Sequence, residues 1–231
     1  MAFMQYNKKN LNSRLIKAAG AGDIENVKSL LKKGADVNAK DVYRDTATLL
    51  ATRREHLDTV KYLVEHGAKV GARDNGRRTA MMLAAQGGHL DTVKYLVDKG
   101  AKIDARNTYG HTAMVLAAFG GHLDTVKYLV EHGAKIDAKD TNEETAMMLA
   151  AFGGHLDTVK YLVEHGADPS LKNNNGETAA IIAMENNHED IADYLNSAMQ
   201  FNEEIIKGID KGNRASALNS QLLGILRKAQ D

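Results

Sequence analysis

Residues 106–138 read RNTYGHTAMVLAAFGGHLDTVKYLVEHGAKIDA, and close copies of this segment stand before and after it. The nine residues HLDTVKYLV occur unchanged four times, beginning at His56, His89, His122 and His155. This spacing of 33 residues also governs a threonine column from Thr46 to Thr178 and a glycine column from Gly34 to Gly166. Three columns in one register indicate an internal repeat.

Each copy contains two short helical patterns. In the quoted copy, Asn107–His111 is rich in turn formers, and Thr112 is a favourable N-cap for the apolar run AMVLAAF, which ends at two glycines. A second helix begins at His122 with apolar residues at helical spacing, and it ends before Gly133. Isolated helices shorter than roughly 12–15 residues are marginal in water. The copies must therefore stack, which predicts an all-α solenoid with a continuous core.

The period, the TAxxLAA run and the GGHLDTV…LVEHGAKIDA run resemble the ankyrin repeat family over about residues 11–197. The resemblance implies a β-turn and a helix pair in each repeat of 33 residues. The family usually reads Thr-Pro-Leu-His where this chain reads TATL, TAMM, TAMV, TAMM and TAAI. Alanine in place of proline keeps the helix but loses some pre-organisation at its start, and the turn-bracing bonds of the missing histidine cannot be assumed.

The repeats also predict how the chain is divided. We expect a disordered N-terminal segment at 1–10, an ankyrin repeat domain at 11–199 and a C-terminal helical extension at 200–231. The expected units of the domain are a cap at 11–39, repeats at 40–72, 73–105, 106–138 and 139–171, and a closing repeat at 172–199. In the extension, one helical face would carry Leu218, Leu222, Ile225 and Leu226. That helix is either a lid on the solenoid end or a docking or self-association helix.

The composition limits the classes of function. The 231 residues include 30 basic and 30 acidic side chains and no cysteine. The balanced charge gives no global attraction to nucleic acid or to an anionic membrane, and no segment approaches the roughly 18 apolar residues that span a bilayer. The lack of cysteine suits a reducing compartment. We therefore expect a soluble, intracellular and cytoplasmic protein without membrane insertion.

The sequence contains no signature of an enzyme. It has no nucleophile elbow, no phosphate-binding glycine loop and no zincin motif. Equivalent histidines of stacked helices would stand roughly 8–10 Å apart, too far to share one zinc ion with bonds of about 2 Å. The family resemblance implies instead that each histidine braces its loop against the neighbouring one. We expect no catalytic residue, no metal and no cofactor.

The copies differ mainly in the turn and the first helix, which line the concave face in the ankyrin family. The variable positions are rich in arginine and aromatic residues, which dominate the energetics of binding surfaces. We predict a partner-binding surface made of Tyr43, Arg44, Arg53, Arg54, Arg77, Arg78, Tyr109, His111, Phe119, Glu143, Glu144 and Phe152. Arginines gather at its first end and glutamates at its last end, and this gradient would orient a partner during association. We expect Arg53 and Arg54, near the rim, to act mainly on the rate of association.

Three of these residues stand where the family usually has a turn glycine, namely Arg44, Arg77 and Glu143. A residue with a side chain is strained there if the position needs a positive φ. The substitutions therefore indicate either a role for these side chains or a relaxed turn.

The preferred hypothesis is a monomeric module without catalytic activity that binds a partner protein through the concave surface. A rival hypothesis is an adaptor or effector whose C-terminal helix docks a second partner or mediates self-association. A weaker one is single-stranded nucleic-acid binding by the arginine-rich half, with steep salt dependence. The identical charged columns resemble designed ankyrin binders, whereas the tail and the lost proline resemble a natural effector, such as one delivered into a host cell by an intracellular bacterium or a virus.

Overall fold

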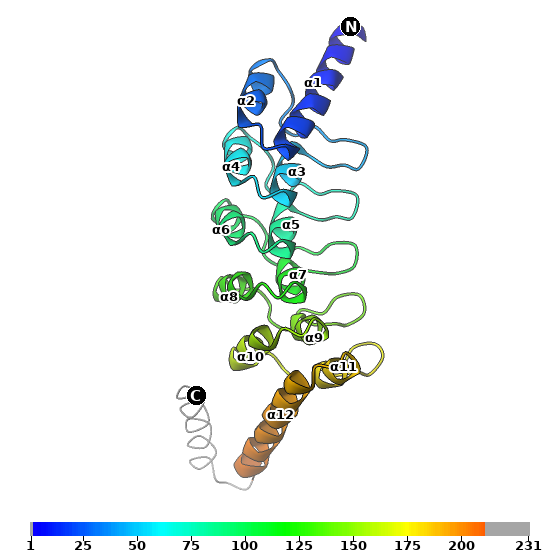
Figure 1. Ribbon diagram of the computed structural model, residues 1–231, viewed down its shortest axis with the longest axis vertical. Coiled ribbons are helices and arrows are strands. Elements are labelled where there is room, and N and C mark those ends of the chain that lie inside the picture. The colour runs from blue at the N-terminus through cyan, green and yellow to red at the C-terminus, as the bar shows by residue number, and fades with distance from the viewer. Residues whose placement is uncertain (1, 211–231) are drawn as a thin grey trace.

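Stacked helix pairs make up the part of the chain that the computed structural model describes, residues 2–210. Figure 1 shows the pairs arranged along one axis, with the first and last helices at opposite ends. One row of helices lies beside a second row, and the loops that join successive pairs project from the first row. Each first helix contacts its own partner and the first helices of the neighbouring units. The arrangement is the predicted all-α solenoid, and the described residues contain no strand.

Two series of helices alternate along the chain. The first helices follow the recurring threonine and are α3 (Ala47–Arg53), α5 (Ala80–Gln86), α7 (Ala113–Phe119), α9 (Ala146–Phe152) and α11 (Ala179–Glu185). The second helices begin in the HLDTVKYLV segment and are α4 (Leu57–Glu65), α6 (Leu90–Asp98), α8 (Leu123–Glu131) and α10 (Leu156–Glu164). The terminal helices are α1 (Ala2–Gly20), α2 (Ile24–Lys32) and α12 (Glu189–Asp210).

The recurring threonine starts each first helix as predicted. The side-chain oxygen of Thr112 accepts a hydrogen bond from the backbone N–H of Val115 at 3.3 Å, and the other four threonines of the column make the equivalent bond. The threonine backbone is extended at this point, which is the usual conformation of an N-cap residue. The cap satisfies one of the N–H groups that a helix start leaves without a partner.

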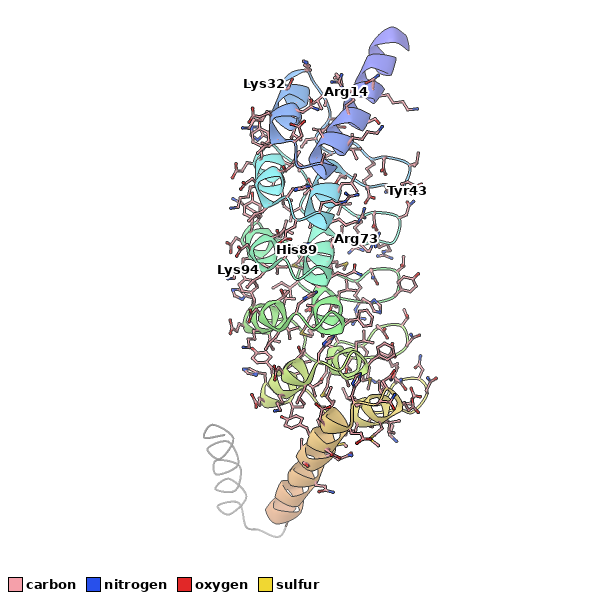
Figure 2. The ribbon with its side chains drawn as sticks, viewed as in Figure 1. Arg14, Lys32, Tyr43, Arg73, His89 and Lys94 are labelled. Carbon is pink, nitrogen blue, oxygen red and sulfur yellow. The ribbon has the colours of Figure 1, made fainter. Side chains whose placement is uncertain are left out.

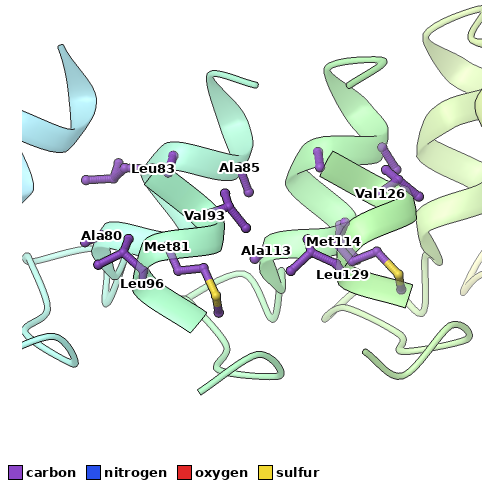
Figure 3. Close-up of a cluster of buried hydrophobic side chains, with 14 of the residues drawn as sticks. Ala80, Met81, Leu83, Ala85, Val93, Leu96, Ala113, Met114, Val126 and Leu129 are labelled. Atoms are coloured by element: carbon purple, nitrogen blue, oxygen red, sulfur yellow. The ribbon is translucent and has the colours of Figure 1, made fainter. Parts of the chain in front are cut away.

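The core lies between the two rows of helices. Val93 and Leu96 of α6 and Met81 of α5 belong to one buried cluster, and none is more than 1% exposed. Figure 3 shows this layer beside the next one, where Met114 and Leu129 occupy equivalent positions. Burying each such side chain contributes about 1.5–3 kcal/mol. Each layer is closed by the units on both sides, so the stack is stable although its helices are short.

Both ends of the chain differ from a simple repeat. Helix α1 begins at Ala2, so residues 2–10 continue the cap helix where a disordered segment was expected. This stretch has no glycine or proline to interrupt a helix. At the other end, α12 runs on to Asp210 without a break, so the C-terminal extension begins as a continuation of the last repeat helix. The predicted amphipathic helix around Leu222 lies outside the described residues.

Replacing a central core leucine tests the layer assignment. Leu96→Ala should lower the free energy of unfolding by about 2–5 kcal/mol, because it leaves a cavity at a side chain that is 0% exposed. Urea unfolding followed by circular dichroism measures the change. Asp91→Ala, on the exposed face of the same helix, is the control and should change stability by less than about 0.5 kcal/mol. A Leu96 effect as small as that of the control would contradict the assignment.

Candidate functional site

The loops between units form a row of hairpin turns that backbone hydrogen bonds hold in register. Within one turn, the Asn107 side-chain oxygen accepts from the backbone N–H groups of Tyr109 and His111 at 2.9 and 3.0 Å. Between turns, the N–H of Thr108 donates to the carbonyl of Gly76, and the N–H of Thr141 donates to that of Tyr109, both at 3.0 Å. Side chains at the tips are therefore presented from a fixed frame.

A column of basic residues braces the foot of the same loops. The Lys40 ammonium donates to the carbonyl of Arg73 at 3.0 Å, and the Arg73 guanidinium donates to the carbonyl of Arg106 at 3.2 Å. Arg106 then donates to the carbonyl of Lys139. The sequence-based set of site residues omitted this column, and its spacing of 33 residues is the signal that could have found it.

Three turn tips are strained in the way that the missing glycines predict. Arg44, Arg77 and Glu143 have φ values of 61°, 58° and 59°, in the left-handed region. This conformation costs roughly 1–3 kcal/mol for a residue with a side chain. Gly110, at the equivalent position of another turn, has a φ of 81°. Of the two alternatives that the sequence left open, the relaxed turn is therefore wrong, and each strained residue carries a charged side chain into solvent.

The last residue of each first helix changes its chemistry along the row. These five equivalent positions carry Arg53, Gln86, Phe119, Phe152 and Glu185. The phenylalanines are 46% and 48% exposed, and their ring centroids lie 6.2 Å apart with an interplanar angle of 20°. Such a stacked pair presents one continuous apolar patch. The row therefore runs from a cation through an aromatic centre to an anion.

The arginine-rich end contains a network of ion pairs that the sequence did not predict. The two terminal nitrogens of Arg53 donate to the two carboxylate oxygens of Asp45 at 3.1 and 3.0 Å. Arg53 also lies 3.8 Å from Asp74, whose carboxylate accepts from the Nε of Arg78 at 2.7 Å. The side chains of Asp45 and Asp74 are only 9% and 3% exposed. Arg53 and Arg78 are therefore half-buried members of an internal network, and Arg53 is not the free rim cation that we expected.

An open pocket of about 330 Å³ lies at this network. Its walls come from two successive turns and the end of α3, and its lining residues are Tyr43, Asp45, Arg53, Asp74, Asn75, Gly76 and Arg78. The tyrosine is 68% exposed and forms part of the wall. The ion-pair network and the pocket thus both lie where the first two turns meet the C-terminal end of α3.

His111 is also committed to a contact within the molecule. Its Nε2 lies 3.1 Å from the carboxylate of Asp140, which is almost fully buried. Its ring centroid lies 5.9 Å from that of Tyr109, which is 66% exposed. His111 therefore links the third turn to the fourth, and Tyr109 remains free to meet a partner.

The twelve predicted site residues lie on the turns and first-helix ends of four successive units, and we call this set the hairpin–helix surface. Eight of them are exposed, namely Tyr43, Arg44, Arg54, Arg77, Tyr109, Phe119, Glu143 and Phe152. Four are half-buried, namely Arg53, Arg78, His111 and Glu144. Figure 2 shows Tyr43 on the side of the turns and Lys94 on the opposite side, among the second helices. The structure therefore brings the predicted residues to one side of the solenoid.

The recurring histidines and tyrosines have structural contacts. The Nε2 of His122 donates to the carbonyl of Gln86 at 3.0 Å, and His155 makes the same bond to Phe119. Among the second helices, the Lys94 ammonium lies 5.9 Å from the ring centroid of Tyr128. Burial, with a smaller effect of Asp98, raises the pKa of the Tyr128 hydroxyl, which therefore stays neutral. The predicted bracing of the loops by histidine is confirmed at these two positions.

The described residues meet neither the requirements of a metal site nor those of a membrane-spanning helix. No group of three or more histidine or acidic side chains in this range could hold a metal ion. No helix in the same range is long and apolar enough to cross a bilayer.

Comparison with known proteins identifies the repeat. A family model for ankyrin repeats, described as three copies, matches residues 4–74, 71–140 and 134–205. One Rickettsia felis protein, described as an ankyrin repeat protein, is 40% identical over 58 residues, which cover 25% of this chain and 92% of that protein. A second such protein of the same organism is 43% identical over 51 residues, covering 22% of this chain and 77% of that protein.

Two turn glycines provide a matched test of the ladder between turns. Gly110 and Gly176 have φ values of 81° and 80°, but only at Gly110 would an added Cβ collide with backbone, lying 2.8 Å from the nitrogen of Thr141. Gly176→Ala should cost about 1–2 kcal/mol from left-handed strain alone. Gly110→Ala should cost about 1–3 kcal/mol more, because the turns must separate. Urea unfolding of both variants measures the difference, and equal costs would contradict the tight approach of the turns.

Proposed function

Because the chain belongs to the ankyrin repeat family, whose repeats generally serve protein–protein interaction, we propose that it binds a partner protein through the hairpin–helix surface and has no catalytic activity. The observation that carries this proposal is the row of first-helix ends, which changes from Arg53 through Phe119 and Phe152 to Glu185. The second helices α4, α6, α8 and α10 are repeated almost unchanged, so the variation in the row of first-helix ends is where recognition is expected.

The aromatic centre supplies the apolar contact that binding needs. Phe119 and Phe152 stack on each other and leave nearly half of each side chain in solvent. Large exposed apolar side chains that adjoin one another typically mark an interaction site. Rigid rings also cover much area with few rotatable bonds, so little conformational entropy is lost on binding.

The charge gradient supports a defined orientation of the partner. At the first end, Arg44, Arg54 and Arg77 are exposed and take part in no ion pair among the described side chains of residues 8–200. At the last end, Glu143 is exposed and lies 2.9 Å from Lys139, and Glu185 is also exposed. Such an arrangement acts on the rate and register of association more than on affinity. Three free arginines steer a partner less strongly than the five that the sequence predicted.

The same ion pairs weaken the hypothesis of nucleic-acid binding. Arg53 and Arg78 are each paired with a buried aspartate, so these pairs add no net positive charge to attract a phosphate backbone. Binding driven by phosphate contacts depends on the number of available cations. A protein partner therefore suits this surface better than a single-stranded nucleic acid.

Truncating the aromatic pair tests the proposed function. Phe119→Ala with Phe152→Ala should weaken binding of the partner by several kcal/mol, since central aromatic side chains each contribute about 2 kcal/mol or more. Affinity purification from cell extract with the intact chain supplies the partner, and surface plasmon resonance measures the affinity. Thermal unfolding should change little, because both rings are about half exposed.

The control for this pair lies on the opposite side of the molecule. Lys94→Ala with Lys127→Ala removes two side chains among the second helices and should leave partner binding intact. If the lysine pair abolishes binding while the phenylalanine pair leaves it unchanged, the partner binds the second helices, and the proposed function of the hairpin–helix surface is wrong.

A second candidate function is an adaptor that uses the C-terminal extension. The specific observation in its favour is the length of α12, which has 22 residues where each second helix of the repeats has 9. A helix that runs beyond its repeat can present a face to a further partner or to a second copy of the chain. In this candidate the main partner contact lies on the C-terminal helix and not on the hairpin–helix surface.

Deleting residues 200–231 separates the two candidates. The solenoid should remain folded with cooperative unfolding, because its stability comes from contacts between neighbouring units. Circular dichroism and size-exclusion chromatography measure folding and association. Partner capture that survives the deletion supports the hairpin–helix surface, whereas loss of capture from a folded chain would establish the adaptor.

A further inference from the structure

The pocket at the arginine-rich end has the properties of a binding site for an anion. We propose that it binds the carboxylate of an aspartate or glutamate side chain on the protein partner, between Arg53 and Arg78. This inference rests on the proposed function, since it names the chemistry that the partner brings to one end of the hairpin–helix surface.

The two arginines are held in place by carboxylates beneath them. Asp45 binds both terminal nitrogens of Arg53, and Asp74 binds the Nε of Arg78. Asp74 is itself fixed, because its other oxygen accepts from the backbone N–H of Arg78 at 2.8 Å. Guanidinium groups oriented in this way lose little side-chain freedom when a ligand arrives.

The arginines still have hydrogen-bond donors to offer. A guanidinium carries five N–H groups. Within residues 8–200, whose side chains the structure describes, Arg78 uses only Nε in a side-chain hydrogen bond, so the N–H groups on both of its terminal nitrogens have no protein acceptor there. Each terminal nitrogen of Arg53 donates one hydrogen bond to Asp45, and the Nε–H of Arg53 is left for a ligand. Both arginines line the pocket, and the side chains of Arg78 and Arg53 are 40% and 34% exposed.

A carboxylate suits the pocket better than a phosphate. The two buried aspartates already neutralise Arg53 and Arg78, and they would repel a phosphate dianion more than a single negative charge. The attraction for a ligand comes from the N–H donors that Arg53 and Arg78 do not spend on the aspartates. Two-pronged binding by a guanidinium is open to carboxylates and phosphates alike, so the preference for a carboxylate rests on its single negative charge.

The pocket is specific to the first two turns. At the position of Arg53 the next units carry Gln86 and Phe119, and at the position of Arg78 they carry His111 and Glu144. Neither of these units has an arginine pair in equivalent places. The arrangement is therefore a local feature of the surface and not part of the repeated scaffold.

Small peptides test the pocket without the partner. The probe is N-acetyl-Gly-Glu-Gly-amide, and its neutral control is N-acetyl-Gly-Gln-Gly-amide. We expect the glutamate peptide, and not the glutamine peptide, to shift the Nε–H signal of Arg78 in ¹H–¹⁵N NMR spectra of the full chain. Titration of this signal and of the Tyr43 ring signals gives the dissociation constant. Shifts that are equal for both peptides, or absent for both, would overturn the proposal.

A matched pair of variants separates the pocket from general attraction. Arg78→Gln should raise the dissociation constant of the glutamate peptide by about tenfold or more, because it removes charged donors from the ligand. Arg54→Gln removes the same charge from a residue that does not line the pocket, and it should change the constant by less than about twofold. Equal losses in both variants would show a diffuse electrostatic effect and overturn the site. If Arg78→Gln lowers the unfolding temperature, Arg78→Lys is the variant to use. Lysine keeps the positive charge but lacks the paired N–H donors of a guanidinium, so this variant should also raise the dissociation constant of the glutamate peptide.

Two further results distinguish the ligand and the surface. A peptide with phosphoserine in place of glutamate should bind no more tightly, and binding of that peptide alone would replace the carboxylate assignment with a phosphate. The Phe119→Ala, Phe152→Ala variant should bind the glutamate peptide unchanged, because neither ring lines the pocket. If the peptide fails while partner capture still needs the phenylalanines, the pocket is wrong and the proposed function stands.

Discussion

The stacking of short helices on neighbouring copies is the constraint on which the rest of the structure depends. First helices of 7 residues and second helices of 9 cannot persist alone in water. Met114 and Leu129 are buried because adjacent units close the layer around them. Each copy of HLDTVKYLV packs against nearly the same surroundings as the copy before it, so the same nine residues suit all four positions. Stability then accumulates from nearest-neighbour contacts.

The repeated scaffold leaves most of the variation to the turns and the ends of the first helices. The ends of the first helices change from Arg53 through Phe119 to Glu185, whereas Lys94 and its equivalents on the second helices stay the same. The backbone bonds between turns keep the tips in register, so a tip residue can change without altering the spacing. The left-handed strain at Arg77 is tolerated for the same reason, because the bonds on either side fix that conformation. Because the backbone of the turns is held rigidly, the side chains on the surface can differ from one repeat to the next.

The sequence predicted the features that depend on near neighbours. The Thr112 cap follows from residues within the same turn and helix, and the spacing alone placed Phe119 and Phe152 in one row. The contact between Arg53 and Asp74 could not be predicted, since the two residues belong to different units and meet only through stacking. Residues 2–10 were misread because they lie outside the repeat, although nothing in them breaks a helix.

The arginine pocket is made of residues that also stabilise the fold, whereas the aromatic patch is not. Asp45 and Asp74 are nearly buried, and a buried carboxylate deprived of its partner costs roughly 3–5 kcal/mol. Arg53 and Arg78 must therefore be kept for the fold, and the donors that they do not spend internally are available to a ligand at no further cost in orientation. Phe119 and Phe152 satisfy no such internal requirement. Changes of partner can thus proceed through the phenylalanines, while the arginine end keeps a fixed preference for an acidic group.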